Sequence, residues 1–276
     1  LETFLNLSYS SRDVLKIYLG MHHTTPFAKF APVPISFHMA DLFGGLESAT
    51  SPDETAAGGP LADRLRPQRL EDVVGQDHLT GPEGAIGRMV AAGRLSSIIL
   101  WGPPGTGKTT TARLLADAVG LRFVAISAVF SGVADLKKVF AEAKDHARLG
   151  KRTLLFVDEI HRFNRSQQDG FLPFVEDGTV TLVGATTENP SFELNAALLS
   201  RAQVLILRRL DHAALTLLLD RAEAMEERPL PLTPEARDAL VASADGDGRF
   251  LLNQAETLFS VRFEQPLDPS ALGDFL

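Results

Sequence analysis

The sequence contains no cysteine, a single tryptophan in 276 residues, and no apolar run of the roughly 18 residues that a membrane-spanning helix needs. Without cysteine the chain forms no disulfide, uses no thiol nucleophile and builds no cysteine-ligated zinc site, which fits a reducing compartment. No basic-then-apolar leader follows Leu1, so we expect no export signal. The net charge of −8 argues against a wholly basic coat for nucleic acid, although a local basic patch stays compatible with it. These features predict a cytosolic globular protein.

Residues 1–60 differ in composition from the rest of the chain. Residues 1–38 mix aromatics, histidines and prolines without sustained periodicity, and residues 39–60 contain four acids but no lysine or arginine. Small residues, proline and acids dominate the second stretch, which is typical of a flexible lead-in. Met39 also marks an alternative start, in which case residues 1–38 are translated upstream sequence. We expect residues 1–60 to be a flexible or mis-started N-terminal extension.

From Leu61 onward, short apolar runs alternate with longer amphipathic stretches. Strands are predicted at 97–101, 122–126, 153–157, 180–185 and 204–207, and helices between them at 108–119, 133–148, 166–176 and 195–201. Strands that alternate with helices indicate a parallel sheet covered on both faces.

After Asp211 only helices are predicted, at 211–226, at 249–261, and after Thr233, which caps a helix with Pro234 in its first position. The predicted fold is therefore α/β. A core at 61–209, with a five-stranded parallel sheet between helices, precedes a small all-helical lid at 210–276.

A glycine-rich phosphate-loop pattern, G-x-x-x-x-G-K-[ST], lies between the first predicted strand and the next helix. Its glycines let backbone N–H groups approach phosphates, Lys108 reaches the β- and γ-phosphates, and the Thr109 hydroxyl ligates magnesium. The following helix presents its positive end to the same anion. The pattern predicts an ATP and Mg²⁺ site formed by Gly102, Pro103, Pro104, Gly105, Thr106, Gly107, Lys108, Thr109 and Thr110.

Two acids, Asp158 and Glu159, follow the third predicted strand. Taken alone they also fit a helix start, but the phosphate loop about 50 residues earlier favours a catalytic pair. Asp158 then joins Thr109 as a magnesium ligand, and Glu159 polarises the attacking water as general base. A carboxylate that activates water favours an ATP hydrolase over a module that only senses nucleotide.

Taken together, these motifs resemble those of a known family. The order of phosphate loop, DEIH, GATTENP, SRA and GDGR resembles the AAA+ ATPases of the clamp-loader branch. Residues 156–202 resemble more closely the replication-associated recombination protein A (RarA) family, and the likeness extends over about residues 61–258. The resemblance implies an AAA+ fold and a magnesium- and DNA-dependent ATPase. Such an enzyme acts at stalled or damaged replication forks, in recombination and repair.

The resemblance also implies roles for residues outside the phosphate loop. Thr187 matches sensor 1, which orients the attacking water, although Thr186 is a rival because the register is ambiguous, and both threonines also fit a turn cap. Arg201 matches an arginine finger acting on the nucleotide of a neighbouring subunit, which implies a homo-oligomer. Clamp loaders usually carry cysteine after this arginine, and here Ala202 stands there. Arg249 matches sensor 2. For both arginines a salt bridge is the alternative.

The resemblance further implies that Val73, Val74 and Gly75 wall the adenine pocket, although adjacent valines fit plain core equally well. Chains of the family continue into a helical domain that drives tetramer formation, whereas this sequence ends at Leu276. We therefore expect that oligomerisation domain to be absent, so that the chain is a fragment or assembles with ATP and DNA.

DNA is the implied partner, contacted mainly through its backbone as gapped, forked or ended duplex. Lys137 and Lys138 lie near the start of one predicted helix, and Arg162 and Arg165 lie just before another. Helix starts and basic side chains suit phosphate contacts, although a solvated helix face accounts for the same residues. No aromatic platform interleaves with them, so base-specific readout is not expected. His161 is assigned to packing or local hydrogen bonding.

Residues 39–43, MADLF, resemble the QxxLF-type peptide that binds bacterial sliding clamps, except that the glutamine is missing. A sliding clamp and single-strand-binding protein are therefore candidate partners, and a nucleoid-associated cytoplasmic location is expected.

Two other functions stay open at this point. One is a nucleotide-switched scaffold that recruits replication or repair partners. The other is a branch-migration motor resembling RuvB, but that family has an extra hairpin before sensor 1 and a DNA-binding domain after the lid. The roughly twenty residues between Glu159 and the fourth strand are too few for that hairpin.

Overall fold

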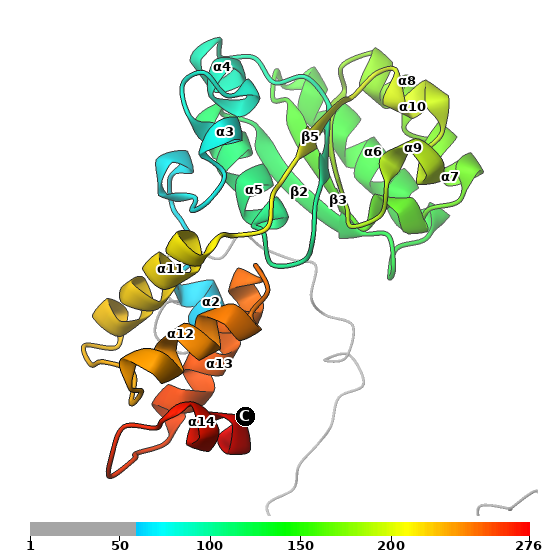
Figure 1. The fold of residues 1–276 in the computed structure, drawn as a ribbon. Coiled ribbons are helices and arrows are strands. Elements are labelled where there is room, and N and C mark those ends of the chain that lie inside the picture. Colours follow the sequence, from blue (N-terminus) through cyan, green and yellow to red (C-terminus); the bar gives the residue numbers. More distant parts are fainter. Residues whose placement is uncertain (1–58) are drawn as a thin grey trace, which may run out of the picture. The chain divides into compact units, whose positions relative to one another are not determined.

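A five-stranded, wholly parallel sheet forms the centre of the fold (Figure 1). The computed structural model describes residues 59–276, so the alternative start and the clamp-type motif near Met39 lie outside the described residues. The strand order is β2-β3-β4-β1-β5, which puts β1 and its phosphate loop between two other strands. The strands are β1 (Ile98–Trp101), β2 (Arg122–Ser127), β3 (Thr153–Asp158), β4 (Val180–Thr186) and β5 (Gln203–Ile206).

Helices cover both faces of this sheet, as the sequence predicts. Alternate strand residues enter different clusters, so that Leu100 packs with Leu115 on one face while Ile99 packs with Phe140 on the other. The helices of this part are α3 (Asp77–Thr80), α4 (Ala85–Ala91), α5 (Lys108–Ala118), α6 (Val133–Arg148), α7 (Arg165–Asp169), α8 (Leu172–Glu176), α9 (Pro190–Glu193) and α10 (Ala196–Leu199), with 3₁₀ turns at Leu70–Asp72 and Ile160–Arg162.

The single helix predicted at 166–176 is wrong, because the structure has two short helices there, α7 and α8. Pro173 has no N–H to continue the hydrogen-bond ladder of α7, so a new helix begins around it. Phe171, at the junction, is fully buried in the sheet cluster. Burial of the Phe171 ring therefore coincides with the break between α7 and α8, where the helical pattern of the sequence predicts one continuous helix.

After β5 the chain forms a helical lid of α11 (His212–Met225), α12 (Pro234–Ser243), α13 (Gly248–Ser260) and α14 (Pro269–Phe275). The side chains of Asp211, Thr233, Asp247 and Asp268 each accept a hydrogen bond from the backbone N–H three residues later, which caps the four helices. The five-stranded parallel sheet with a helical lid is therefore confirmed.

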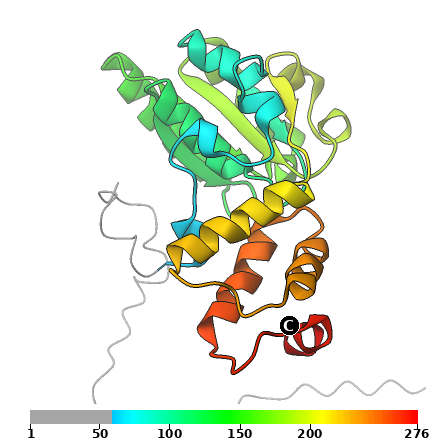
Figure 2. The same cartoon turned by 60° about the vertical axis from the view of Figure 1, so that its left-hand side comes forward.

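A short helix from the start of the described chain, α2 (Leu61–Arg64), also packs in this lid (Figure 2). The Leu61 side chain is fully buried there, and its backbone N–H donates to Glu256 at 2.9 Å. Arg64 forms an ion pair with Glu226 at 2.6 Å. The division at residue 61 stays a prediction, but the first helix after it belongs by packing to the lid.

The connection from β5 to α11 is held by a buried glutamine. Gln76 is 1% exposed; its amide donates to the Arg208 carbonyl at 2.8 Å and accepts from the Arg208 N–H at 3.1 Å. We call this connection, residues 207–211, the hinge. Further along it, the Leu210 N–H donates to the Gly246 carbonyl of the lid at 3.2 Å. The N-terminal segment, the hinge and the lid are thereby tied together beside the phosphate loop.

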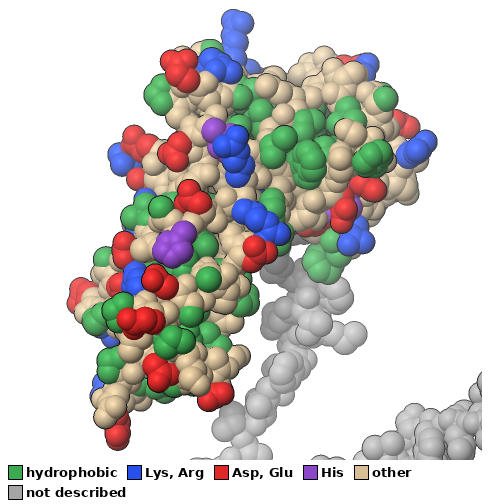
Figure 3. All heavy atoms as spheres, in the orientation of Figure 1, with side chains coloured by type: hydrophobic (Ala, Val, Ile, Leu, Met, Phe, Trp, Pro, Cys, Tyr) green, Lys and Arg blue, Asp and Glu red, His purple; other side chains and the backbone are tan. Residues whose placement is uncertain are grey.

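Acidic and basic side chains intermingle over the face drawn in Figure 3, without a continuous basic patch. In the part of the chain that the structure describes, no helix is both long and apolar enough to cross a membrane.

Candidate nucleotide-binding site

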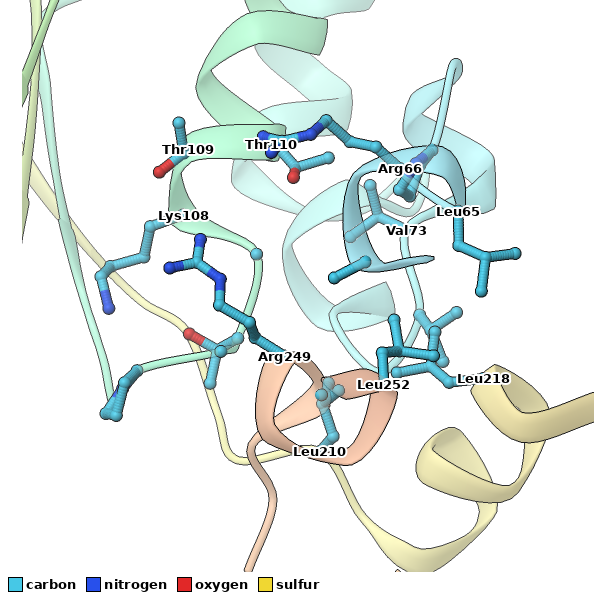
Figure 4. Close-up of a pocket in the computed structure, with 18 of the residues that line it drawn as sticks. Leu65, Arg66, Val73, Lys108, Thr109, Thr110, Leu210, Leu218, Arg249 and Leu252 are labelled. Carbon is cyan, nitrogen blue, oxygen red and sulfur yellow. The ribbon is translucent and has the colours of Figure 1, made fainter. Parts of the chain in front are cut away.

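A cavity lies where the phosphate loop, the N-terminal segment and the lid meet (Figure 4). The carboxyl ends of β1, β3 and β4 open toward it, as expected for a ligand site of an open parallel sheet. Its lining residues are Ala62, Asp63, Leu65, Arg66, Pro67, Val73, Val74, Pro104, Gly105, Thr106, Gly107, Lys108, Thr109, Thr110, Asp158, Glu159, Thr187, Leu210, Leu218, Gly248, Arg249 and Leu252.

The phosphate loop holds its own lysine through backbone carbonyls. The Lys108 ammonium donates to the carbonyls of Gly102 and Pro103, both at 2.8 Å, and these two residues do not themselves line the cavity. Burial lowers the pKa of Lys108, while the carboxylates of Glu159 and Asp158 oppose that shift. The loop therefore presents a desolvated cation at the cavity, which an anionic ligand can neutralise.

The donor set beside Lys108 fits magnesium. Thr109 and Asp158 both line the cavity and offer a hydroxyl and a carboxylate, the hard oxygen donors that Mg²⁺ prefers. Mg²⁺ is usually held by one or two protein groups together with phosphates and water. Within residues 59–276 no cluster of three or more His, Asp or Glu side chains forms a separate metal cage.

Glu159, which directly follows the predicted magnesium ligand Asp158, has a strained backbone, with φ of +50° and ψ of +46°. This left-handed conformation is rare for a residue other than glycine and is found often at functional sites. The Thr187 hydroxyl donates to Glu159 Oε2 at 3.4 Å, and both residues line the cavity.

Thr186, the rival for sensor 1, faces the other way. It is fully buried, accepts from the Glu188 N–H at 3.0 Å, and lies 2.9 Å from Nδ1 of His161. Of the two threonines, Thr187 is thus the one that lines the cavity.

The lid contributes Arg249 from the first turn of α13. The Gly248 N–H donates to the Gly105 carbonyl at 3.3 Å, so this helix start contacts the phosphate loop directly. In Figure 4 the Arg249 guanidinium extends toward Lys108 and Thr109. Among the described residues it forms no ion pair, which leaves its charge available to an anion in the cavity.

The opposite end of the cavity is apolar and suits a flat base. Val73 and Val74 line it as the sequence implies, together with side chains that sequence reasoning missed, Leu65, Leu218 and Leu252 (Figure 4). The two lid leucines lie on helix faces whose periodicity cannot distinguish a cavity wall from core. Arg66, also missed, extends toward Thr110 from this end (Figure 4).

Gly75 was expected in this wall but is not among its lining residues. It has φ of +73°, and a Cβ there would lie 2.8 Å from Leu210 and 3.2 Å from Ala214. Its place is explained by the close approach of the hinge and α11 rather than by contact with a ligand.

Arg201, the expected finger, also lies outside the cavity. It follows α10, with a side chain 38% exposed, and its Nε donates to Glu176 at 2.6 Å. It therefore does not act on this cavity of its own chain, and its outward position suits contact with a second subunit.

The four basic residues expected to meet DNA are all exposed and lie away from the cavity. Lys137 and Lys138 are on α6, Arg162 closes the 3₁₀ turn after β3, and Arg165 begins α7. Lys137 borders a groove between α6 and α7.

The comparisons with known proteins agree with this geometry. The family model of the ATPase family associated with various cellular activities (AAA) matches residues 98–210. Replication-associated recombination protein A of Coxiella burnetii is 50% identical over 211 residues, covering 75% of this chain and 48% of that protein. Its Escherichia coli K12 namesake is 47% identical over 206 residues, covering 72% and 46%. Over these roughly 210 residues the chain is similar to the replication-associated recombination protein A family. The chain spans about half the length of the curated relatives it matches.

The AAA family whose model matches residues 98–210 is described as a family of ATPases. Among solved structures, the RuvB Holliday junction branch migration motor of Thermotoga maritima is similar, with a TM-score of 0.62 and 25% identity over 76% of this chain and 72% of that one. In residues 160–179, before β4, the structure has a 3₁₀ turn and two short helices and no hairpin.

Proposed function

We propose that this chain is a magnesium-dependent ATPase whose turnover responds to DNA at stalled or damaged replication forks. The observation that carries the ATPase part is the convergence of Lys108, Asp158, Glu159, Thr187 and Arg249 on one cavity, from separate segments of the chain. The DNA part is supported by the names of the RarA relatives and by the exposed basic residues on α6 and α7.

In the proposed reaction, the oxygen of water forms a bond to the γ-phosphorus while the bond to the β,γ-bridging oxygen breaks, giving ADP and phosphate. Lys108 and the loop N–H groups bind the phosphates, and Glu159 accepts the proton of the attacking water. Thr187 orients that water, and Arg249 binds the γ-phosphate from the lid. Magnesium, held by Thr109 and Asp158, would neutralise developing charge on the phosphate oxygens.

Oligomerisation is part of the proposal, because Arg201 lies outside its own cavity and pairs with Glu176 on the surface. In a ring or filament, this guanidinium would reach the nucleotide of a neighbouring subunit. DNA contacts through Lys137, Lys138, Arg162 and Arg165, binding to a sliding clamp or single-strand-binding protein, and a nucleoid location belong to the same proposal.

The first test is steady-state ATP hydrolysis with magnesium in the presence of no DNA, intact duplex, and gapped or forked DNA. It is run on this chain and on a longer one that includes the remaining half of its relatives. We expect gapped or forked DNA to stimulate turnover, and Glu159→Gln to bind ATP yet hydrolyse it at least 100-fold more slowly. Turnover that no DNA changes would contradict DNA coupling and favour the nucleotide-switched scaffold. Junction movement in a strand-exchange assay would favour the RuvB-like motor.

A further inference from the structure

His161 lies against the proposed general base although the nucleotide cavity does not include it. It sits in the 3₁₀ turn that follows β3, and its side chain is 8% exposed. Its Nδ1 lies 3.3 Å from Glu159 Oε2 and 2.9 Å from Thr186 Oγ1. The sequence predicted only packing or local hydrogen bonding for His161, and its closeness to Glu159 was not expected.

The surrounding hydrogen bonds decide which ring nitrogen carries the proton. The Glu188 N–H donates to Thr186 Oγ1 at 3.0 Å, and the Thr186 hydroxyl reaches the Glu188 carbonyl at 3.2 Å, which uses its single proton. An unprotonated Nδ1 would turn its lone pair toward a carboxylate oxygen of Glu159, which is repulsive. A proton on Nδ1 removes that repulsion, donates to Thr186 Oγ1, and places a partial positive charge 3.3 Å from Oε2 of Glu159. The network therefore assigns His161 as the Nδ1–H form.

This donor leaves the two carboxylate oxygens of Glu159 with different tasks. Oε2 accepts from Thr187 at 3.4 Å and faces His161 Nδ1. Oε1 has no protein partner among residues 59–276. A general base needs one oxygen free to take a proton, and the Thr187 hydrogen bond together with the nearby Nδ1–H fixes the other oxygen, which aims the free one.

We propose that His161 is a positioning residue, whose Nδ1–H donates to Thr186 and attracts Oε2 of Glu159 across 3.3 Å, so that Oε1 faces the attacking water. This inference rests on the proposed role of Glu159 as general base. The turn itself is firmly placed, since the Arg162 N–H donates to the Glu159 carbonyl at 2.8 Å and the Ile160 side chain is fully buried. His161 thereby ties the strained backbone of Glu159 to the buried end of β4.

Three substitutions separate hydrogen bonding from packing. His161→Asn places an amide N–H close to where Nδ1 lies, His161→Gln places it close to where Nε2 lies, and His161→Phe keeps a ring without a donor. A packing role is best preserved by Phe. A positioning role is preserved by Asn alone.

The experiment measures kcat and KM for ATP in each variant, with thermal melting to check that each is folded. We expect His161→Asn to keep kcat within about threefold of the unsubstituted chain. His161→Phe and His161→Gln should lower kcat about 10- to 100-fold at unchanged KM. Wild-type kcat in His161→Phe would overturn the proposal, as would equal kcat values for the Asn and Gln variants. If the Phe variant does not fold, the comparison of Asn with Gln still decides.

A double substitution distinguishes an error in the role of His161 from an error in the proposed role of Glu159. In a Glu159→Gln background, His161→Phe should lower hydrolysis no further and leave ATP affinity unchanged, because the carboxylate it positions is already gone. A further 10-fold loss there would overturn the positioning role. Normal hydrolysis by Glu159→Gln alone would instead overturn Glu159 as the base.

Discussion

Two adjacent threonines at the end of β4 have opposite surroundings, as neighbouring residues of a strand do. Thr186 is fully buried, and its hydroxyl bonds to Glu188 and lies beside His161. Thr187 lines the nucleotide cavity and donates to Glu159. A single residue step thus separates a structural hydroxyl from one that can meet water or phosphate.

Thr187→Ala and Thr186→Ala should therefore fail differently. Thr187→Ala should keep its melting temperature and lower kcat about 10- to 100-fold, because it removes one hydrogen bond to a charged group. Thr186→Ala should lower the free energy of unfolding by about 1 kcal/mol, because the part-buried hydrogen bond from the Glu188 N–H is lost. Thermal melts and steady-state ATP hydrolysis are the measurements. Normal turnover in Thr187→Ala would rule it out as sensor 1.

At the scale of elements, the hinge after β5 is fixed by one side chain from a distant segment. The amide nitrogen and the amide oxygen of the Gln76 side chain both hydrogen-bond to the backbone of Arg208, and the side chain is almost completely excluded from solvent. The hinge backbone has no strand partner for these groups, so the glutamine replaces a missing ladder.

Gln76→Ala should lower the free energy of unfolding by about 1–3 kcal/mol, since it removes a buried side chain and two part-buried hydrogen bonds to the Arg208 backbone. Denaturant unfolding followed by circular dichroism measures the change. Gln68→Ala is the matched control, because Gln68 is exposed and bonds only to the nearby Arg66 carbonyl. Equal stability of the two variants would contradict the role given to Gln76.

The contact between lid and phosphate loop can be tested at Gly105. A Cβ there would lie 1.8 Å from Asp247 Oδ1, the side chain that caps α13. Gly105→Ala should displace the lid helix and weaken ATP binding about 10-fold or more, measured by calorimetry.

Gly93→Ala is the control for that substitution. Gly93 has φ of +60°, close to the +66° of Gly105, yet a Cβ there would meet nothing within 4 Å. Both variants carry the cost of a left-handed alanine, about 1–2 kcal/mol, but only Gly105→Ala adds the clash. Equal ATP affinities in the two would argue against a lid contact at the loop.

At the scale of the whole molecule, the cavity lacks one residue of the catalytic set that the resemblance implies. Arg201 is on the surface beside Glu176 and does not line the cavity of its own chain. Under the proposed function, the charge that completes the site would come from another copy of the chain.

Arg201→Ala should keep ATP affinity and lose about 10³-fold or more in turnover, since an arginine finger acts in the transition state. Mixing it with Lys108→Ala subunits should restore part of the activity, because the Lys108→Ala subunit supplies an intact finger to an intact site. Arg148→Ala is the control, as Arg148 is an exposed arginine in an ion pair with Asp145. No recovery on mixing would contradict action between subunits.

Local sequence determined much of this protein. The phosphate loop, the acids after an apolar strand and the alternation of strands with helices predict the parallel sheet and the edge where phosphates bind, and the sheet is confirmed. These features are legible because backbone freedom, strand period and helix capping depend on neighbours in the chain.

Tertiary structure decided the rest. The break at Pro173 and the burial of Phe171, the lid leucines that wall the cavity, and the placement of His161 against Glu159 all join segments that are distant or turn at a buried ring. An apolar helix face reads the same whether it meets core or a base, and a histidine reads the same whatever its ring nitrogen contacts. Only packing sets which atoms come within hydrogen-bond distance, and that distance decides the chemistry.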